Sequence, residues 1–172
     1  MPGDDAGPQI WAKTTVRAMS RDVVTLLPSG LRDENGNSGD VEGSTLEGAK
    51  AIVFVLDVSA VSGVDPKLDV AIYAKLGDWY YRMLQFGQKT AADTSGRQIR
   101  RDGASFTDAI SVLTEVPTPS AASGYVKDGV PWAETFVVAY KIQGTFAPGE
   151  PGPPEVLAEG ITFSVTAIPL DF

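Results

Sequence analysis

The clearest candidates for chemistry in this chain are the acidic and amide side chains of residues 33–40, DENGNSGD. Asp33, Asn35 and Asn37 are spaced like the first oxygen ligands of a calcium-binding loop. The match then fails, because a serine stands at the sixth position, where such a loop needs glycine, and another at the twelfth, where it needs glutamate. The pattern therefore favours a solvated turn. A different kind of calcium site is the weaker alternative, and its ligands would be Asp33, Asn35, Asn37 and Asp40.

Asp57 and Asp69 form a second candidate pair, since they are equally far from Gly63 along the chain. If the chain reversed at Gly63 as a symmetric hairpin, the two carboxylates would face each other across it. Opposed carboxylates are the catalytic groups of glycosidases, although like charges in that position destabilise a strand pair. A register that separates the two side chains is therefore the favoured interpretation.

Three consecutive aromatic residues, Trp79, Tyr80 and Tyr81, begin a predicted strand. They could stack on a sugar, but aromatic side chains that alternate along a strand more often pack in the core on one face and in an interface on the other. Because side chains alternate along a strand, we expect Trp79, Tyr81 and Met83 on one side and Tyr80 and Arg82 on the other. Trp79 and Tyr80 are therefore interface candidates.

Positive charge gathers at Arg97, Arg100 and Arg101, within the polar segment 88–103. These arginines could form an anion-binding patch or contact an acidic neighbouring protein, and we take them as interface candidates. A solvated loop is the simpler interpretation of the segment.

Residues 1–20 are expected to form an extended N-terminal arm, because their prolines and glycines disfavour a regular strand. Ile10 and Trp11 are apolar side chains that such an arm cannot bury by itself. The arm is either a partly ordered tail or a contact arm that docks Trp11 on a neighbouring subunit. In the second interpretation Ile10 and Trp11 are interface residues.

Composition narrows the chemistry further. The chain of 172 residues contains no cysteine and no histidine, so it lacks disulfides, thiolates and the ligands most typical of zinc, copper and iron. We therefore expect neither enzyme activity nor a cofactor. The formal net charge of −8 argues against nucleic acid as the main partner. No apolar run is long enough for a membrane helix, and the acidic start lacks the features of an export signal.

The elements that must position these residues are strands. In residues 50–75 a nearly continuous apolar run is followed, after Ser62-Gly63 and Asp65-Pro66, by strict alternation, which predicts a long β-hairpin. Further strands are expected at 21–27, 79–86, 109–116, 130–144 and 161–170. The expected fold is all-β: an antiparallel β-sandwich or jelly-roll-like single domain over residues 21–172, preceded by the arm of residues 1–20.

The apolar rows of the clearest strands also predict the core. Ten side chains are expected to be largely buried: Val53, Val55, Val58, Leu68, Val70, Ile72, Phe136, Val138, Phe163 and Val165.

Four sequence blocks occur in a fixed order after the segment NGNSGD: LDVSAVSG at 56–63, LDV at 68–70, FGQKT at 86–90 and ITFSVTA at 161–167. They resemble a group of small β-sandwich virion proteins of tailed bacteriophages, in which a D-V-[TS]-A-V-S-G … P-x-L-D-V hairpin, an F-x-Q-x-T strand and a terminal T-F-S-V strand recur. The resemblance extends from about residue 36 to the C-terminus. The hairpin tip departs from the group's pattern, and residues 144–160 replace a compact turn.

The resemblance implies a non-enzymatic structural protein of the virion, synthesised in the host cytoplasm. Proteins of this group serve as capsid decoration or cement proteins, or as neck, tail or fibre-base components, and the blocks do not distinguish these roles. We expect a homo-oligomer, with a trimer preferred, that binds the major capsid protein or other virion proteins. A carbohydrate-binding or adhesion module that uses the aromatic residues 79–81 is the alternative from another class.

Overall fold

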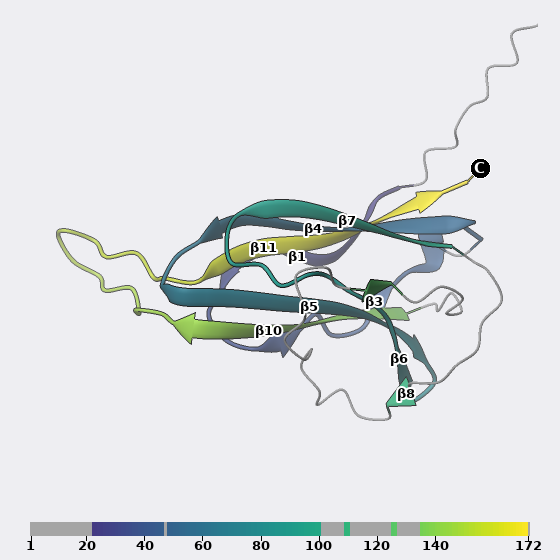
Figure 1. Ribbon diagram of the computed structural model, residues 1–172, viewed down its shortest axis with the longest axis horizontal. Coiled ribbons are helices and arrows are strands. Elements are labelled where there is room, and N and C mark those ends of the chain that lie inside the picture. Colours follow the sequence, from purple (N-terminus) through teal and green to yellow (C-terminus); the bar gives the residue numbers. More distant parts are fainter. Residues whose placement is uncertain (1–21, 47, 101–108, 111–124, 127–134, 172) are drawn as a thin grey trace, which may run out of the picture.

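The computed structural model describes residues 22–46, 48–100, 109–110, 125–126 and 135–171. Its strands are β1 (Val24–Arg32), β2 (Gly36–Asn37), β3 (Val41–Glu42), β4 (Ala51–Val61), β5 (Val64–Leu76), β6 (Trp79–Gln85), β7 (Asp93–Arg100), β8 (Ala109–Ile110), β9 (Tyr125–Val126), β10 (Thr135–Thr145) and β11 (Ile161–Leu170), with one short 3-10 helix, Ser44–Leu46. They form two antiparallel sheets that pack face to face (Figure 1). The first sheet has the order β1-β11-β4-β7. The second has the order β2-β10-β5-β6-β8, with β3 also paired to β10 and β9 to β6. The expected all-β sandwich is confirmed.

The core lies between the two sheets and follows from alternation along the strands. In β11, Ile161, Phe163, Val165 and Ala167 are buried, and the residues between them are partly exposed. Eight of the ten predicted core side chains are buried, and the other two, Val53 and Val55, are only partly buried. The inward row of β4 is the even-numbered one, Ile52, Phe54, Leu56 and Val58. Each fully buried side chain of this size contributes roughly 1.5–3 kcal/mol to stability.

The expected hairpin over residues 50–75 is wrong in its pairing, although both of its strands exist. β4 ends in the first sheet and β5 begins in the second, so the two strands do not pair with each other. Gly63 has a φ of +105°, which lets the chain turn from one sheet to the other. The Ser62 N–H donates to the Gly160 carbonyl (3.0 Å), and the Gly160 N–H donates to Ser62 Oγ (2.9 Å). These bonds fix the corner to the start of β11.

Two segments expected as loops contain strands. β1 does not end at residue 27 but continues through Pro28 to Arg32, with register shifts on both sides of Leu27. It is an edge strand, where a proline without an N–H is tolerated. β7 lies inside the expected polar loop 88–103 and pairs with β4. The expected strands at 109–116 and 130–144 fall partly outside the described residues, and the N-terminal arm of residues 1–20 falls wholly outside them.

At its centre β5 is buried on both faces. Leu68, Val70, Ile72 and Ala74 join the core between the sheets, as the alternation predicts. The opposite row contributes Ala71 and Tyr73 to a second, smaller apolar cluster, together with Val137 and Ala139 of β10. The second sheet therefore contributes buried side chains on both of its faces.

One connection extends beyond the sandwich. Residues 146–160, which link β10 to β11, run outward from one end of the two sheets (Figure 1). We call this segment the projecting loop. Glu150 and Val156 exchange two backbone hydrogen bonds across it, of 3.0 and 3.2 Å, and the Glu159 N–H donates to the Ala147 carbonyl at 2.9 Å. These bonds give the projecting loop a ladder-like stem.

Candidate contact surfaces

The acidic segment 33–40 belongs to the edge of the second sheet, since it contains β2, which pairs with β10. The Oδ1 atom of Asn35 accepts a hydrogen bond from the Ile142 N–H (2.7 Å). The Oδ1 atom of Asn37 accepts one from the Gly39 N–H (2.8 Å). The asparagines that resemble calcium ligands in the sequence therefore hold the backbone of this edge. Most of the segment is exposed, as expected of the favoured solvated turn, but it also contains the short edge strand β2.

The two acidic members of the calcium candidate differ in their surroundings. Asp40 forms an ion pair with Lys75, and this hydrogen bond raises the pKa of Lys75 above its ordinary value. Asp33 is exposed. Among the described residues, no group of three or more His, Cys, Asp or Glu side chains could hold a metal ion. A calcium site at Asp33, Asn35, Asn37 and Asp40 stays a prediction, and a cation there would compete with Lys75 and with two backbone hydrogen bonds.

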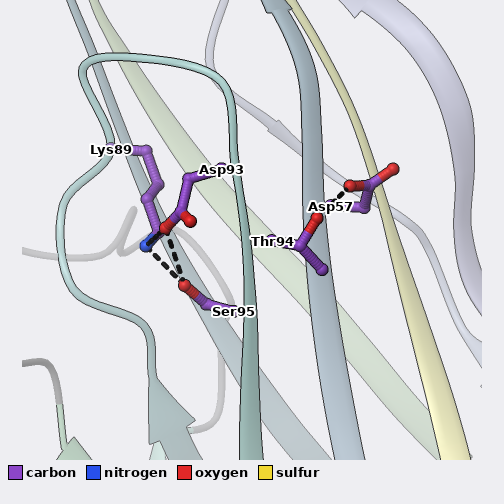
Figure 2. Close-up of polar contacts among 5 residues, drawn as sticks. All are labelled: Asp57, Lys89, Asp93, Thr94 and Ser95. Atoms are coloured by element: carbon purple, nitrogen blue, oxygen red, sulfur yellow. Dashed lines mark hydrogen bonds and ion pairs between the residues drawn. The ribbon is translucent and has the colours of Figure 1, made fainter.

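Asp57 and Asp69 do not face each other, because β4 and β5 lie in different sheets. Asp57 is exposed and accepts a hydrogen bond from Thr94 Oγ1 at 2.6 Å (Figure 2). Asp69 is fully buried, and Gln88 Nε2 donates to its Oδ2 atom at 2.9 Å. The two carboxylates occupy the outward rows of opposite sheets. The prediction of an opposed carboxylate pair, as glycoside hydrolysis requires, is wrong. The favoured prediction, that the two side chains are separated, is confirmed.

The structure describes only part of the predicted basic group. Arg97 lies opposite Phe54 in the pairing of β7 with β4, and directly paired residues share a face, so Arg97 lies on the inward row. An inward charge on an edge strand hinders the pairing of that edge with another chain. Arg100 ends β7, and Arg101 lies outside the described residues. The interpretation of Arg97 and Arg100 as part of a solvated loop is wrong.

A polar cluster that the sequence did not reveal joins the β6–β7 connection to β7. The ammonium group of Lys89 contacts the Asp93 carboxylate and Ser95 Oγ, and Ser95 Oγ donates to Asp93 Oδ2 at 3.0 Å (Figure 2). The hydrogen bond from Lys89, aided by the one from Ser95, holds the pKa of Asp93 below its ordinary value. Lys89 also exchanges two backbone hydrogen bonds with Leu68 of β5, so the cluster connects the two sheets.

Asp93→Asn should lower the melting temperature at neutral pH and leave it nearly unchanged in acid. Ionised Asp93 stabilises the folded state above the ordinary aspartate pKa, and this contribution is lost as the pH falls through the lowered pKa. Thermal melts of the variant and the wild-type chain, at neutral pH and below the aspartate range, measure the difference. Asp65→Asn removes a carboxylate from the exposed Asp65–Lys67 pair and controls for net charge. A difference of equal size at both pH values contradicts the prediction.

The aromatic residues occupy the end of the sandwich away from the projecting loop. Trp79 is 51% exposed, Tyr80 is partly buried, and Tyr81 packs against the core. The expected alternation holds only up to Arg82, because a register shift in the β5–β6 pairing places Met83 and the next residue, Leu84, both in the core. Of these three aromatic side chains, Trp79 is therefore the one that a partner can reach.

The outward face of the first sheet is almost free of charge. Its two central strands present valine, threonine, serine and isoleucine side chains, all partly buried: Val53, Val55, Thr162, Ser164, Thr166 and Ile168. β11 contains no charged residue. On the outward rows whose side chains the structure describes, charge appears only at Asp57, toward one end of the face. A nearly uncharged sheet face is unusual in a chain with 22 acidic and 14 basic residues.

Arg32 has a role that the sequence did not indicate. It lies at the end of the edge strand β1, next to the projecting loop. Its guanidinium group donates hydrogen bonds to the carbonyls of Pro28, Gly30 and Phe163, at 2.7–2.9 Å. It also lies over the rings of Phe163 and Tyr140, with Cζ 4.7 and 5.6 Å from their centroids. This arginine therefore has a structural role, and no local sequence signal distinguishes it from an exposed one.

Comparisons with protein-family models, with curated proteins and with solved structures found no match for this chain. No helix in the described part of the chain is long and apolar enough to cross a membrane. Ile10 and Trp11, the predicted contact residues of the N-terminal arm, lie outside the described residues.

Proposed function

We propose that this protein is a non-enzymatic structural component of a tailed-phage particle, and that it decorates or cements the capsid. The proposal rests on the sequence blocks that resemble phage virion proteins. These blocks fall on β4, β5, the β6–β7 connection and β11. The blocks on β4, β5 and β11 supply central strands of both sheets, whereas the FGQKT block, a strand in the group's pattern, lies in a connection here. The shared central strands would give the protein a scaffold like that of the group it resembles.

The observation that carries the proposal in the structure is the nearly uncharged outward face of the first sheet, formed mainly by β4 and β11. Depletion of charge is the compositional mark of the central part of a protein interface. A protein with a net charge of −8 can approach a large assembly most easily through such a face, because few charges lose their hydration there. We propose that this face lies against the capsid shell.

The mechanism is passive. A rigid sandwich buries one face on the shell, and each contact can be weak because many symmetric copies act together. A protein that binds the assembled shell, and not its separate subunits, stabilises the shell by mass action. The N-terminal residues Ile10 and Trp11 are a second proposed contact with a neighbouring subunit.

A neck, tail or fibre-base component is the alternative within the same class. Exposed Trp79 favours one candidate from another class, a carbohydrate-binding or adhesion module, because an exposed tryptophan can stack on a sugar ring. Counting the copies of this protein in purified particles by mass spectrometry separates these roles. Hundreds of copies support decoration of the capsid, about a dozen or fewer support a neck or tail position, and absence contradicts both.

Val55→Glu combined with Thr166→Glu should abolish incorporation into particles. Two opposed carboxylates should also lower the stability of the strand pair slightly, so thermal melts verify that the variant is folded. The two side chains lie on neighbouring strands and are directly paired, so two added carboxylates would stand together in the centre of the proposed contact. Loss of binding of about a hundredfold or more is expected when buried charges have no partner. Particle-bound protein, measured after sedimentation of the particles, checks this.

Ala92→Glu is the matched control, since it adds a carboxylate at an exposed position of the β6–β7 connection. It should be incorporated like the wild-type chain. Unchanged incorporation of the Val55/Thr166 variant would show that another surface binds the shell.

A further inference from the structure

The end of the sandwich that carries the projecting loop gathers exposed apolar side chains (Figure 1). Among the described residues six large apolar side chains are exposed, and four of them lie at this end: Leu31, Val64, Val156 and Leu157. Val64 is paired with the last residue before the loop, and Leu31 with the second residue after it. Apolar side chains that are grouped in this way on a surface mark an interaction site.

The same surface carries negative charge that is not neutralised. The projecting loop contains three glutamates and no lysine or arginine. Glu159 belongs to the stem, because its Oε2 atom accepts a hydrogen bond from the Ala147 N–H at 2.9 Å. Glu150 and Glu155 are exposed, and no side chain in the described part of the chain pairs with either carboxylate. Two free carboxylates beside apolar side chains favour a partner that is both apolar and basic.

The projecting loop is also rich in proline and held in one shape. It contains four prolines, and its stem is held by the two backbone bonds between Glu150 and Val156. Aromatic side chains are the usual partners of proline-rich segments. A preorganised surface loses little conformational entropy when it binds. The partner that fits this loop therefore supplies an aromatic side chain together with its positive charge.

One segment of this chain has that composition. Residues 9–21, QIWAKTTVRAMSR, combine the apolar side chains of Ile10 and Trp11 with three basic residues and contain no acidic residue. We call them the basic segment. The chain as a whole has 22 acidic and 14 basic residues, so the basic segment is opposite in charge to the rest of the protein and to the projecting loop.

The direction of β1 indicates which copy receives the basic segment. Val24 pairs with Ala167 and Arg32 with Ile161, so β1 begins at the end away from the projecting loop and ends beside it. Its nine residues span roughly 30 Å at about 3.3 Å per residue. A basic segment that docked on its own molecule would have to reverse and cover this distance. A second copy placed end to end lies in the direction from which the chain enters β1, and the chain from Trp11 to Val24 can span up to roughly 45 Å.

We propose that the basic segment of one copy docks on the projecting loop of a second copy. Its apolar side chains pack on the prolines and on Leu157, and its basic side chains lie beside Glu150 and Glu155. The contact is head-to-tail, because it joins different surfaces of the two molecules. This inference rests on the homo-oligomeric part of the proposed function and names the surface on which Trp11 docks. The uncharged face of the first sheet takes no part in it.

The first test reverses the charges on each side of the contact. Sedimentation velocity over a range of concentrations compares the wild-type chain with Glu150→Lys/Glu155→Lys and with Lys13→Glu/Arg17→Glu. The wild-type chain should form oligomers, and each double variant should raise the dissociation constant about tenfold or more. The glutamate variant makes the chain less negative, so net charge alone would strengthen its association. Weakening therefore reports the contact itself.

A chain that carries all four reversals restores opposite charges across the contact and should regain most of the association. Glu42→Lys/Asp78→Lys is the matched control, because it makes the same change of charge at exposed positions of the opposite end of the sandwich. It should associate at least as strongly as the wild type. Thermal melts verify that all variants are folded, as expected for exposed positions.

The second test uses the absence of cysteine from the chain. Ala12→Cys and Ala158→Cys, each as a single variant, are mixed and oxidised, and the disulfide-linked products are identified by mass spectrometry. A link between position 12 of one copy and position 158 of the other supports the head-to-tail contact. The Ala12→Cys/Ala158→Cys chain is oxidised in parallel to detect a link within one molecule.

Three results would overturn the inference: a monomeric wild-type chain, unchanged association of both charge-reversed variants, or a 12–158 link that is absent or forms only within one molecule. Particle incorporation decides the proposed place in a virion separately. A chain that binds particles as a monomer would defeat the inference and leave the proposed function standing. Head-to-tail oligomers that are never incorporated into particles would do the reverse.

Discussion

Phe163→Ala should lower the free energy of unfolding by about 3–5 kcal/mol. The Phe163 side chain is fully buried in the first sheet, and its ring packs edge-to-face on Tyr140, with centroids 5.2 Å apart. The Arg32 guanidinium lies over the same ring. The substitution therefore leaves a cavity and removes the apolar support of a partly buried cation. Urea unfolding followed by circular dichroism measures the change.

Two controls make this prediction specific. Phe163→Leu keeps most of the apolar volume and should cost clearly less than the alanine variant. Leu157→Ala removes a side chain that is 77% exposed and should be nearly neutral for stability. A Phe163→Ala variant as stable as Leu157→Ala would contradict the placement of β11 in the centre of the first sheet.

The order and type of the long strands could be predicted because their signal is local. β11 alternates buried and partly exposed residues without interruption. β10 and β5 are buried on both faces at their centres, and in β5 it is the residue type that alternates along the sequence. Such alternation reports the side-chain period of a strand, which is independent of the strand's neighbours. The same local logic supplied eight of the ten core residues correctly.

The pairing of the strands could not be predicted in the same way. β4 and β5 are separated by only Ser62 and Gly63, and a short link with glycine is typical of hairpins. The apolar row of each strand faces the same core in a hairpin and in two opposed sheets, so the pattern is equally compatible with both. The turn that decides between them depends on backbone angles and on a hydrogen bond to Gly160, which is distant in sequence.

Polar edge strands were missed for a related reason. β7 carries Asp93, Arg97 and Arg100 and has no apolar row of its own beyond Ile99. Its pairing depends on the length of β4 and on contacts of Lys89, neither of which is encoded within β7. The candidate sites shared this limit, since carboxylates and asparagines that seem grouped in the sequence are engaged in separate structural contacts.

Gly63→Ala should destabilise the protein by roughly 2–5 kcal/mol, since strain in the backbone and a steric clash act together. Gly63 has a φ of +105°, which side-chain-bearing residues rarely adopt. A Cβ atom there would also lie 2.8 Å from the Thr145 carbonyl oxygen and 2.7 Å from Phe146 Cδ1. The phenyl ring can move, but the carbonyl belongs to the end of β10 and cannot yield without disturbing its pairing with β5.

Gly77→Ala separates the two causes, because Gly77 also has a positive φ, of 58°, but a Cβ atom there meets nothing within 4 Å. This variant should lose only the cost of the left-handed backbone, about 1–2 kcal/mol. Urea unfolding of both variants, compared at equal m-values, gives the difference between them. That difference is the contribution of close packing at the corner where the chain passes from the first sheet to the second. Equal losses for the two variants would mean that Gly63 serves an ordinary turn and that the corner does not approach β10 closely.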